Sequence, residues 1–141
     1  IHIRQAEKML DVKPVTPSHA DYALHQEAIR QLTEYFEGMR RAFDLPLAVE
    51  GTDYRKNVWR EMAQIPYGET ISYAELARRA GNGKAVRAIG SACGANPIPL
   101  VLPCHRVVGS DGNLCGFGWG LEVKEFLLAL ENQSAAVRQA A

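Results

Sequence analysis

The segment Pro103-Cys104-His105-Arg106 places a thiol directly beside an imidazole, in a turn constrained by the preceding proline. A cysteine attacks as its thiolate, whereas a free thiol has a pKa near ~8.5, so a nucleophilic Cys104 needs a base or a positive field nearby. Neighbouring side chains usually diverge, and a bridging water would solve that geometry for His105. A buried carboxylate such as Glu131, after the apolar helix expected over 121–130, could orient the imidazole. Spacing alone leaves open whether the Cys-His pair is catalytic or structural.

The cysteine count and the hydropathy narrow the class of protein. Three cysteines at 93, 104 and 115 are an odd number without CxxC spacing, so we expect neither a disulfide framework nor a thiolate zinc site. The N-terminal part offers histidines at 2, 19 and 25 but no cysteine, so we expect no metal there, and nothing in the motif calls for a cofactor. There is no run of 18 apolar residues and no visible signal peptide. We therefore expect no membrane contact and a reduced compartment, the cytoplasm or, in a eukaryote, the nucleus.

Charge is balanced over the whole chain but not along it. The 141 residues carry 16 basic and 16 acidic side chains, which gives no global field for nucleic acid. Residues 51–110 hold eight basic residues against four acidic ones, an excess of four positive charges. A surface that faces phosphates has such an excess, and so does an ordinary solvated surface.

Helical periodicity organises the rest of the chain. We expect a first helix over about 21–41 and a second that begins at Thr52 and stops at Pro66-Tyr67-Gly68. Between them, the segment 43–50 with Pro46 marks the expected domain boundary. The alternating start Ile1-His2-Ile3 looks like the end of a strand, and we expect further sequence before it. The apolar stripe of the first helix is Ile29, Leu32, Phe36 and Met39, and that of the second is Val58, Trp59, Met62 and Ile65.

Two short helices around a glycine-containing turn follow, which is the pattern of a helix-turn-helix. Ser72 and Glu75 form a capping box at the start of the first, which ends at Gly81. The second runs from Lys84 to about residue 93, with positions 86, 89 and 93 inward. Its exposed side is nearly bare at Ala88 and Gly90, which together with one arginine suits the minor groove of DNA. Close packing of helices inside the protein is the alternative.

The motif around the thiol does not stand alone, and the set as a whole resembles the O6-alkylguanine-DNA alkyltransferase family. The similarity covers about residues 50–131 with the spacing kept, and the helix near 21–41 also resembles the segment before the family's catalytic domain. The similar blocks are Ile65-Pro66-Tyr67-Gly68-Glu69, Ile71-Ser72-Tyr73, Ala85-Val86-Arg87-Ala88-Ile89-Gly90, Asn96-Pro97, Pro103-Cys104-His105-Arg106-Val107 and Leu121…Lys124…Leu127-Leu128…Glu131.

The resemblance implies a role for individual residues. The alkyl acceptor falls on Cys104, its water-bridged base on His105, the orienting carboxylate on Glu131 and the asparagine that shapes the turn on Asn96. Backbone groups at Cys104, Val107 and Ser110 would read the damaged base, with Tyr73 donating a hydrogen bond or proton to the departing guanine. Arg87 would fill the space of the rotated nucleotide and Tyr73 would push the flanking phosphate. The implied DNA-contacting residues are Tyr73, Lys84, Ala85, Arg87, Ala88 and Gly90.

The resemblance also implies the fold and the overall activity. We expect an α+β protein with a small, shortened α/β lobe at 1–50 and a mostly helical winged helix-turn-helix domain at 51–141. The implied activity is a single, irreversible transfer of an alkyl group from O6-alkylguanine, and O4-alkylthymine as well, to Cys104. The expected partner is double-stranded DNA that contains alkylated guanine, bound by a monomer in the minor groove with the nucleotide flipped out.

The sequence departs from the family pattern at two positions, and three other functions are alternatives to the one that the resemblance implies. Phe117 stands where the family commonly has tyrosine, and Trp119 where several members have glycine. Trp119 either narrows the room for bulky alkyl groups or packs against the terminal helix. A non-catalytic lesion sensor of the same fold has tryptophan in place of Cys104. A transcription factor predicts an inert Cys104, and a cysteine hydrolase predicts turnover.

Overall fold

The helix that precedes the helix-turn-helix begins where its cap predicts. In the computed structural model, which describes residues 19–140, helix α3 spans Asp53–Met62 and the Thr52 hydroxyl accepts a hydrogen bond from the Arg55 backbone N–H at 3.2 Å. Such a cap satisfies one of the N–H groups that the first turn of a helix leaves without a partner. The expected stripe is confirmed, because Val58, Trp59, Met62 and Ile65 are all buried.

The next two helices form the expected helix-turn-helix. Helix α4 spans Tyr73–Arg79 and helix α5 spans Val86–Gly94, and both pack on α3. The Ser72 hydroxyl caps α4 by accepting from the Glu75 N–H at 3.0 Å. The Glu75 carboxylate itself binds Arg78 and Arg79, so the reciprocal half of the predicted capping box is replaced by ion pairs. Gly81 lies in the turn after α4 and has a φ of 89°, a left-handed conformation that glycine adopts without steric cost.

The inner face of α5 matches the prediction of positions 86, 89 and 93 only in part. Ile89 and Ala92 are buried, whereas Val86 is 42% exposed and Cys93 is partly buried. The indole N–H of Trp59 donates to the Ala92 carbonyl at 2.8 Å and so ties α3 to α5. Val86 is left outside because it begins the helix beside the exposed turn.

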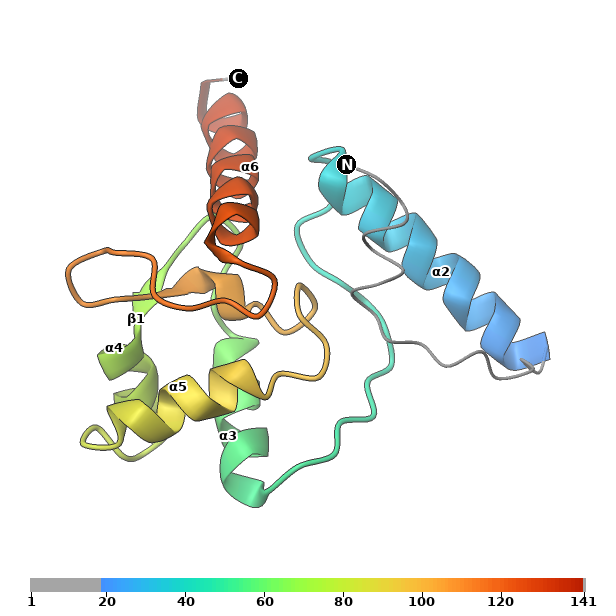
Figure 1. Ribbon diagram of the computed structural model, residues 1–141. Helices are drawn as coiled ribbons and strands as arrows, with labels where there is room; N and C mark the ends of the chain where they lie inside the picture. Colours follow the sequence, from blue (N-terminus) through green and yellow to red (C-terminus); the bar gives the residue numbers. More distant parts are fainter. Residues whose placement is uncertain (1–18, 141) are drawn as a thin grey trace.

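A short parallel sheet joins the helix-turn-helix to the Cys104 segment. Strand β1, Ile71–Ser72, pairs with strand β2, Val107–Val108, with Ile71 opposite Val107. A 3₁₀ turn, η1, spans Cys104–Arg106 and leads directly into β2. Because α4 begins right after β1, this pairing brings the start of α4 beside the turn that holds the cysteine. The long helix α6, Leu121–Ala140, follows β2 after a loop and rises from this unit (Figure 1).

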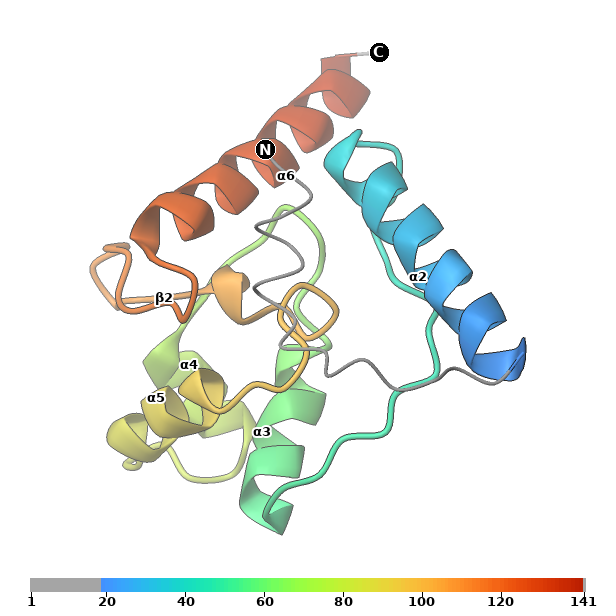
Figure 2. The same cartoon turned by 45° about the vertical axis from the view of Figure 1, so that its right-hand side comes forward.

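The N-terminal part departs most from its prediction. Helix α2 spans His19–Phe36, its C-terminal end approaches α6, and a long extended segment joins it to α3 (Figures 1 and 2). Its predicted stripe is wrong, since Ile29, Phe36 and Met39 are 58%, 46% and 67% exposed. The buried residues are Gln31 and Tyr35, which have specific partners across the interface, and Leu32 is partly buried. The predicted strand end at 1–3 lies outside the described residues.

Two clusters of apolar side chains hold the molecule together. The larger one joins α3, α4, α5 and the Cys104 segment, and the smaller one joins Tyr35 of α2 with Leu100 and Leu127. Between residues 19 and 140 no helix is long and apolar enough to cross a membrane.

Candidate active site

The cysteine turn is built by an asparagine. The Asn96 amide donates to the Leu102 carbonyl at 2.7 Å and its oxygen accepts from the Ile98 N–H at 3.0 Å, which closes the loop before Cys104. Within this loop Leu100 has a φ of 77°, a left-handed conformation that costs a residue with a side chain roughly 1–2 kcal/mol. The backbone strain at Leu100 is therefore offset by the Asn96 bonds and by burial of the Leu100 side chain.

The thiol at the end of this turn is shielded from water. Cys104 is 7% exposed, and burial raises the pKa of its thiol, because the charged form loses hydration. A hydrogen bond from Asn96 and the charge of Lys124 act in the opposite direction. The thiol is therefore protonated in the resting protein, and a base is needed to make it a nucleophile.

His105 is the candidate base, and the way its Nε2 is held leaves Nδ1 as the nitrogen that can accept a proton. His105 is fully buried and its Nε2 lies 2.7 Å from Oε1 of Glu131. An ionised carboxylate can only accept, so His105 Nε2 carries the proton and Nδ1 keeps its lone pair. Nδ1 is buried and has no hydrogen-bond partner within residues 19–140. The arrangement leaves Nδ1 ready to take a proton.

Glu131 is held as an anion by several donors. Arg106 donates from Nε to Oε2 at 3.0 Å and from Nη2 to Oε1 at 2.9 Å, and the Gly68 N–H donates to Oε2 at 3.2 Å. The Tyr35 hydroxyl donates to Oε1 at 2.8 Å. Burial by itself would raise the pKa of Glu131, but the hydrogen bonds from His105 and Arg106 and the positive charge of Arg106 outweigh it and lower the pKa to about 2.

The imidazole stays neutral in this environment. Burial lowers the pKa of His105 first of all, and the charges of Arg106 and Lys124 lower it further, against the attraction of Glu131. Because Arg106 already compensates the charge of Glu131, a second proton on His105 gains little. A neutral imidazole is what a general base requires.

The thiol opens onto a cavity of about 440 Å³ between α5 and the loop before α6. Tyr73 lies on its wall and donates its hydroxyl to the Cys115 carbonyl at 2.8 Å. Burial raises the pKa of Tyr73 to about 12, so this hydroxyl is a hydrogen-bond donor throughout the neutral range. Burial also raises the pKa of Cys93 to about 12, which leaves Cys93 a poor nucleophile although it lines the same cavity. The side chains and glycine that shape the cavity include Tyr73, Arg87, Gly90, Cys93, Cys104 and Phe117.

A buried lysine supports the cavity wall, and sequence reasoning gave it no role. Lys124 is fully buried, and its ammonium group donates to the carbonyls of Val107 at 2.6 Å and Cys115 at 3.1 Å. It joins α6 to both ends of the loop between β2 and α6 and places a positive charge near the thiols. A signal was present, because Lys124, Leu127 and Glu131 recur at helical spacing on one otherwise apolar face of α6.

The exposed face of α5 carries the residues expected to meet DNA. Arg87, Ala88 and Gly90 are exposed, and a side chain added at Gly90 would meet nothing within 4 Å. Gly90 and Arg87 also line the cavity, so this face and the thiol share one opening. Lys84 is exposed in the turn before α5, and Ala85 is the residue that caps this helix. Ala88 and Gly90 are therefore not used for packing inside the protein.

Two of the expected base-reading positions lie elsewhere. Val107 is fully buried and its carbonyl is occupied by Lys124, and Ser110 is exposed on the following loop. Neither residue is among those that line the cavity, whereas Cys104 is. Val107 supports the wall through Lys124 in this structure.

The two unusual aromatic residues of the loop have different surroundings. Both rings pack against the cluster of Tyr35, Leu100 and Leu127, but Phe117 also lines the cavity and Trp119 does not. The two rings meet edge to face with centroids 5.6 Å apart. The packing alternative for Trp119 is thus the one that the structure favours.

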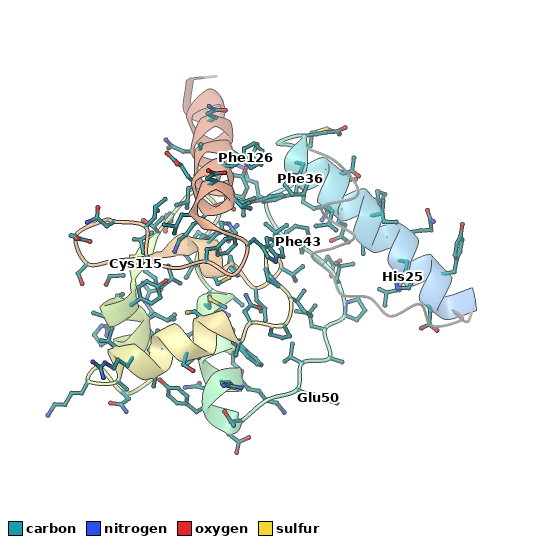
Figure 3. The ribbon with its side chains drawn as sticks, in the orientation of Figure 1. His25, Phe36, Phe43, Glu50, Cys115 and Phe126 are labelled. Atoms are coloured by element: carbon teal, nitrogen blue, oxygen red, sulfur yellow. The ribbon has the colours of Figure 1, made fainter. Side chains whose placement is uncertain are left out.

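The described residues offer no cluster of three His, Cys, Asp or Glu side chains that could hold a metal ion. His25 lies on α2, far from Cys115 on the loop between β2 and α6 (Figure 3). The thiol of Cys104 lines the cavity, and the next residue in the chain is a buried neutral imidazole held by an anionic carboxylate.

Comparison with known proteins gives a consistent result. Residues 53–133 match the family model described as 6-O-methylguanine DNA methyltransferase, DNA binding domain, and residues 3–49 match the ribonuclease-like domain of the same name. A methylated-DNA–protein-cysteine methyltransferase of Methanosarcina barkeri is 53% identical over 109 residues, which are 77% of this chain and 69% of that protein.

Solved structures agree with the sequence matches. The structure of Mycobacterium tuberculosis OGT in complex with DNA has a TM-score of 0.76 and 46% identity, covering 77% of this chain and 68% of that chain. The structure of S. pombe Atl1 in complex with damaged DNA containing O6-carboxymethylguanine has a TM-score of 0.51 and 28% identity, covering 59% of this chain and 79% of that one.

Proposed function

The chain belongs to the 6-O-methylguanine DNA methyltransferase family, and on that premise we propose that it repairs O6-alkylguanine in DNA by moving the alkyl group to its own Cys104. The observation that carries the proposal is the buried contact of His105 Nε2 with Glu131 at 2.7 Å. The Nδ1 atom of this residue, which follows Cys104 in the chain, has no hydrogen-bond partner among the described residues. A thiol, a base and an orienting carboxylate occur there in the order that nucleophilic catalysis needs.

The transfer conserves atoms and charge. His105 Nδ1 accepts the proton of the Cys104 thiol through a water, and the sulfur attacks the alkyl carbon. The bond between that carbon and O6 breaks and its electron pair stays on guanine. Guanine then takes up one proton while His105 gives up the one that it received, so the proton of the thiol is transferred in net terms to guanine. Because the product at Cys104 is a thioether, which does not hydrolyse under mild conditions, each molecule acts once.

Tyr73 and Lys124 assist the two charges that develop. Tyr73 can donate to the departing guanine when its hydroxyl leaves the Cys115 carbonyl, and its high pKa makes it a hydrogen-bond donor in this step. The charge of Lys124 favours the thiolate form of Cys104. Preorganised groups of this kind act mostly by stabilising charge in the transition state.

In this proposal, the alkylated nucleobase reaches the cavity by rotating out of the DNA double helix. The exposed face of α5 opens onto the cavity at Gly90 and Arg87, so DNA bound along α5 lies next to the thiol. We assign Arg87 to the space that the rotated nucleotide leaves and Ala88 and Gly90 to close approach in the minor groove. O4-alkylthymine presents the same alkyl ether and is the second substrate that we propose.

Intact mass of the protein tests the proposal directly. After incubation with an oligonucleotide that contains one O6-methylguanine, the wild type gains about 14 Da once per molecule, because S–CH₃ replaces S–H. The Cys104→Ser variant gains nothing. Tight binding of the lesion without a mass change in the wild type would make the protein a sensor, and repeated turnover would make it a hydrolase.

A further inference from the structure

A tyrosine from the N-terminal helix touches the proton relay. Tyr35 of α2 is fully buried, and its hydroxyl donates to Oε1 of Glu131 at 2.8 Å across 96 residues of sequence. The same oxygen accepts from His105 Nε2 at 2.7 Å. The phenol and the imidazole therefore share one acceptor atom in the interior.

The hydroxyl of Tyr35 has a purpose beyond packing. Its ring already contacts the rings of Phe36, Phe43 and Tyr67, with centroids 5.4, 5.4 and 6.1 Å away, and a phenylalanine would make the same contacts. The neighbouring Tyr67 hydroxyl is buried without a hydrogen-bond partner in the described part of the chain. Tyr67 is therefore the internal comparison for Tyr35, because its phenol belongs to the same cluster but its hydroxyl makes no hydrogen bond to a described residue.

A hydrogen bond to a carboxylate does two things here. It is charge-assisted and restrains the orientation of the group, since the donors around Glu131 approach both of its oxygens. It also draws electron density from Oε1, which weakens the pull of that oxygen on the proton of His105. The less basic Oε1 is, the more readily His105 remains neutral.

The other charged and titratable groups near His105 also affect its protonation. Arg106 from η1 and Lys124 from α6 both oppose a positive charge on His105, while Cys104 precedes it in the chain. The Tyr67 ring lies under the Arg106 guanidinium at 5.6 Å. Tyr35 is the group that α2 adds to this set.

We propose that Tyr35 is a positioning residue of the proton relay: its hydroxyl fixes the Glu131 carboxylate and offsets part of its charge, so that His105 stays neutral and presents Nδ1 to Cys104. This inference rests on the proposed function for its catalytic meaning, but the state of His105 is a property of the protein without DNA. The N-terminal helix thereby supplies a working part of a site whose nucleophile lies in the other half of the chain.

The test compares Tyr35→Phe with Tyr67→Phe. Both variants remove one buried phenol oxygen from the same cluster, and only the first removes a hydrogen bond to Glu131. Single-turnover transfer is measured from pH 5 to 9 with an O6-methylguanine oligonucleotide. We expect Tyr35→Phe to move the acidic limb of the profile upward by roughly half to one pH unit, which slows transfer along that limb by up to roughly three- to ten-fold. The rates should converge at high pH, and Tyr67→Phe should keep the wild-type limb.

The second measurement is a nitrogen NMR titration of His105 in the same three proteins without DNA. We expect the midpoint of protonation to rise in Tyr35→Phe alone. An unshifted midpoint, or a loss of rate that is equal at all pH values, would overturn the proposal and make Tyr35 a packing residue. If none of the three proteins transfers the methyl group but the protonation midpoint of His105 shifts as expected, the proposed function fails while the effect of Tyr35 on His105 stands. Thermal unfolding of each variant verifies that it is folded.

Discussion

At the scale of single residues, burial changes the thiol and the imidazole in opposite directions. It raises the pKa of Cys104 and lowers that of His105, so a resting thiolate–imidazolium pair is disfavoured in this site. In the proposed reaction, the proton therefore leaves the sulfur while the new bond to carbon forms, with the positive charge of Lys124 close by. On that proposal, the thiol stays unreactive until an alkylated base fills the cavity, which suits a protein that reacts only once.

Phe117, rather than Trp119, should set how large an alkyl group fits. We expect Phe117→Ala to raise the rate for a benzyl group relative to methyl by roughly ten-fold, because removing a ring from the wall enlarges the cavity. Single-turnover rates on O6-benzylguanine and O6-methylguanine oligonucleotides give the ratio.

Trp119→Gly is the matched change on the same loop. Trp119 packs on Leu127 and Leu100 and meets the cavity only through its edge contact with Phe117, so the ratio should change far less than in Phe117→Ala. A larger change from Trp119→Gly than from Phe117→Ala would show that the tryptophan itself limits the substrate.

At the scale of elements, α5 combines close approach with one long cation. Its exposed positions 88 and 90 carry almost no side chain, while Arg87 extends from the same face at the mouth of the cavity. A helix of this kind brings its backbone near another surface and inserts a single guanidinium. The short β1–β2 sheet then fixes the distance between this helix pair and the cysteine turn.

Arg87→Ala should slow repair without harming the thiol. Extrusion of a base costs a few kcal/mol, and loss of the filling side chain should lower the transfer rate on duplex DNA by roughly ten- to a hundred-fold. Transfer from the free base O6-benzylguanine, which needs no extrusion, should stay near the wild-type rate.

Arg30→Ala is the control for charge. Arg30 is an exposed arginine paired with Glu27 and Glu34. It belongs to helix α2, which lies away from α5 (Figure 2). Equal loss of duplex repair in both variants would mean that Arg87 contributes only general attraction to phosphate.

At the scale of the whole molecule, one carboxylate connects four segments. Glu131 of α6 accepts from Tyr35 of α2, from His105 and Arg106 of η1, and from the backbone at Gly68. The same contacts that set the relay therefore hold the N-terminal helix against the helix-turn-helix half. Catalytic geometry and stability depend on one group.

Glu131→Gln should lose both activity and a pH-dependent part of the stability. The folded pKa of Glu131 is about 2 against an ordinary value of 4.5, so its contribution to stability is fully present above pH 4.5 and disappears as pH falls toward 2. We expect the variant to lose about 3 kcal/mol of unfolding free energy at pH 7, because Arg106 stays buried without its anion.

Urea unfolding at several pH values measures this difference. It should narrow below pH 4.5 for Glu131→Gln and be near zero at all pH values for Glu125→Gln, an exposed change on the same helix. A difference that is constant with pH would assign the loss to packing instead of charge.

Local patterns were predictable because they depend on neighbours in the chain. The caps at Thr52 and Ser72, the stripe of α3 and the adjacency of Cys104 and His105 all follow from residues within a few positions of one another. The resemblance of the motifs added the family and with it the role of Glu131, which spacing alone left as one possibility.

Contacts between segments far apart in the sequence could not be predicted and are visible only in the tertiary structure. Periodicity shows which residues share a face of α2 but not which face meets a partner, so Ile29 and Phe36 were predicted inside and lie outside. The buried face is the polar one because Gln31 bonds both backbone groups of Asp44 and Tyr35 reaches Glu131.

The buried cation at Lys124 and the shared oxygen of Glu131 likewise depend on groups far apart in sequence. The sequence determined the reactive groups and the elements that carry them. Only the folded chain decided which nitrogen of His105 is occupied, because that depends on where α6 places its carboxylate.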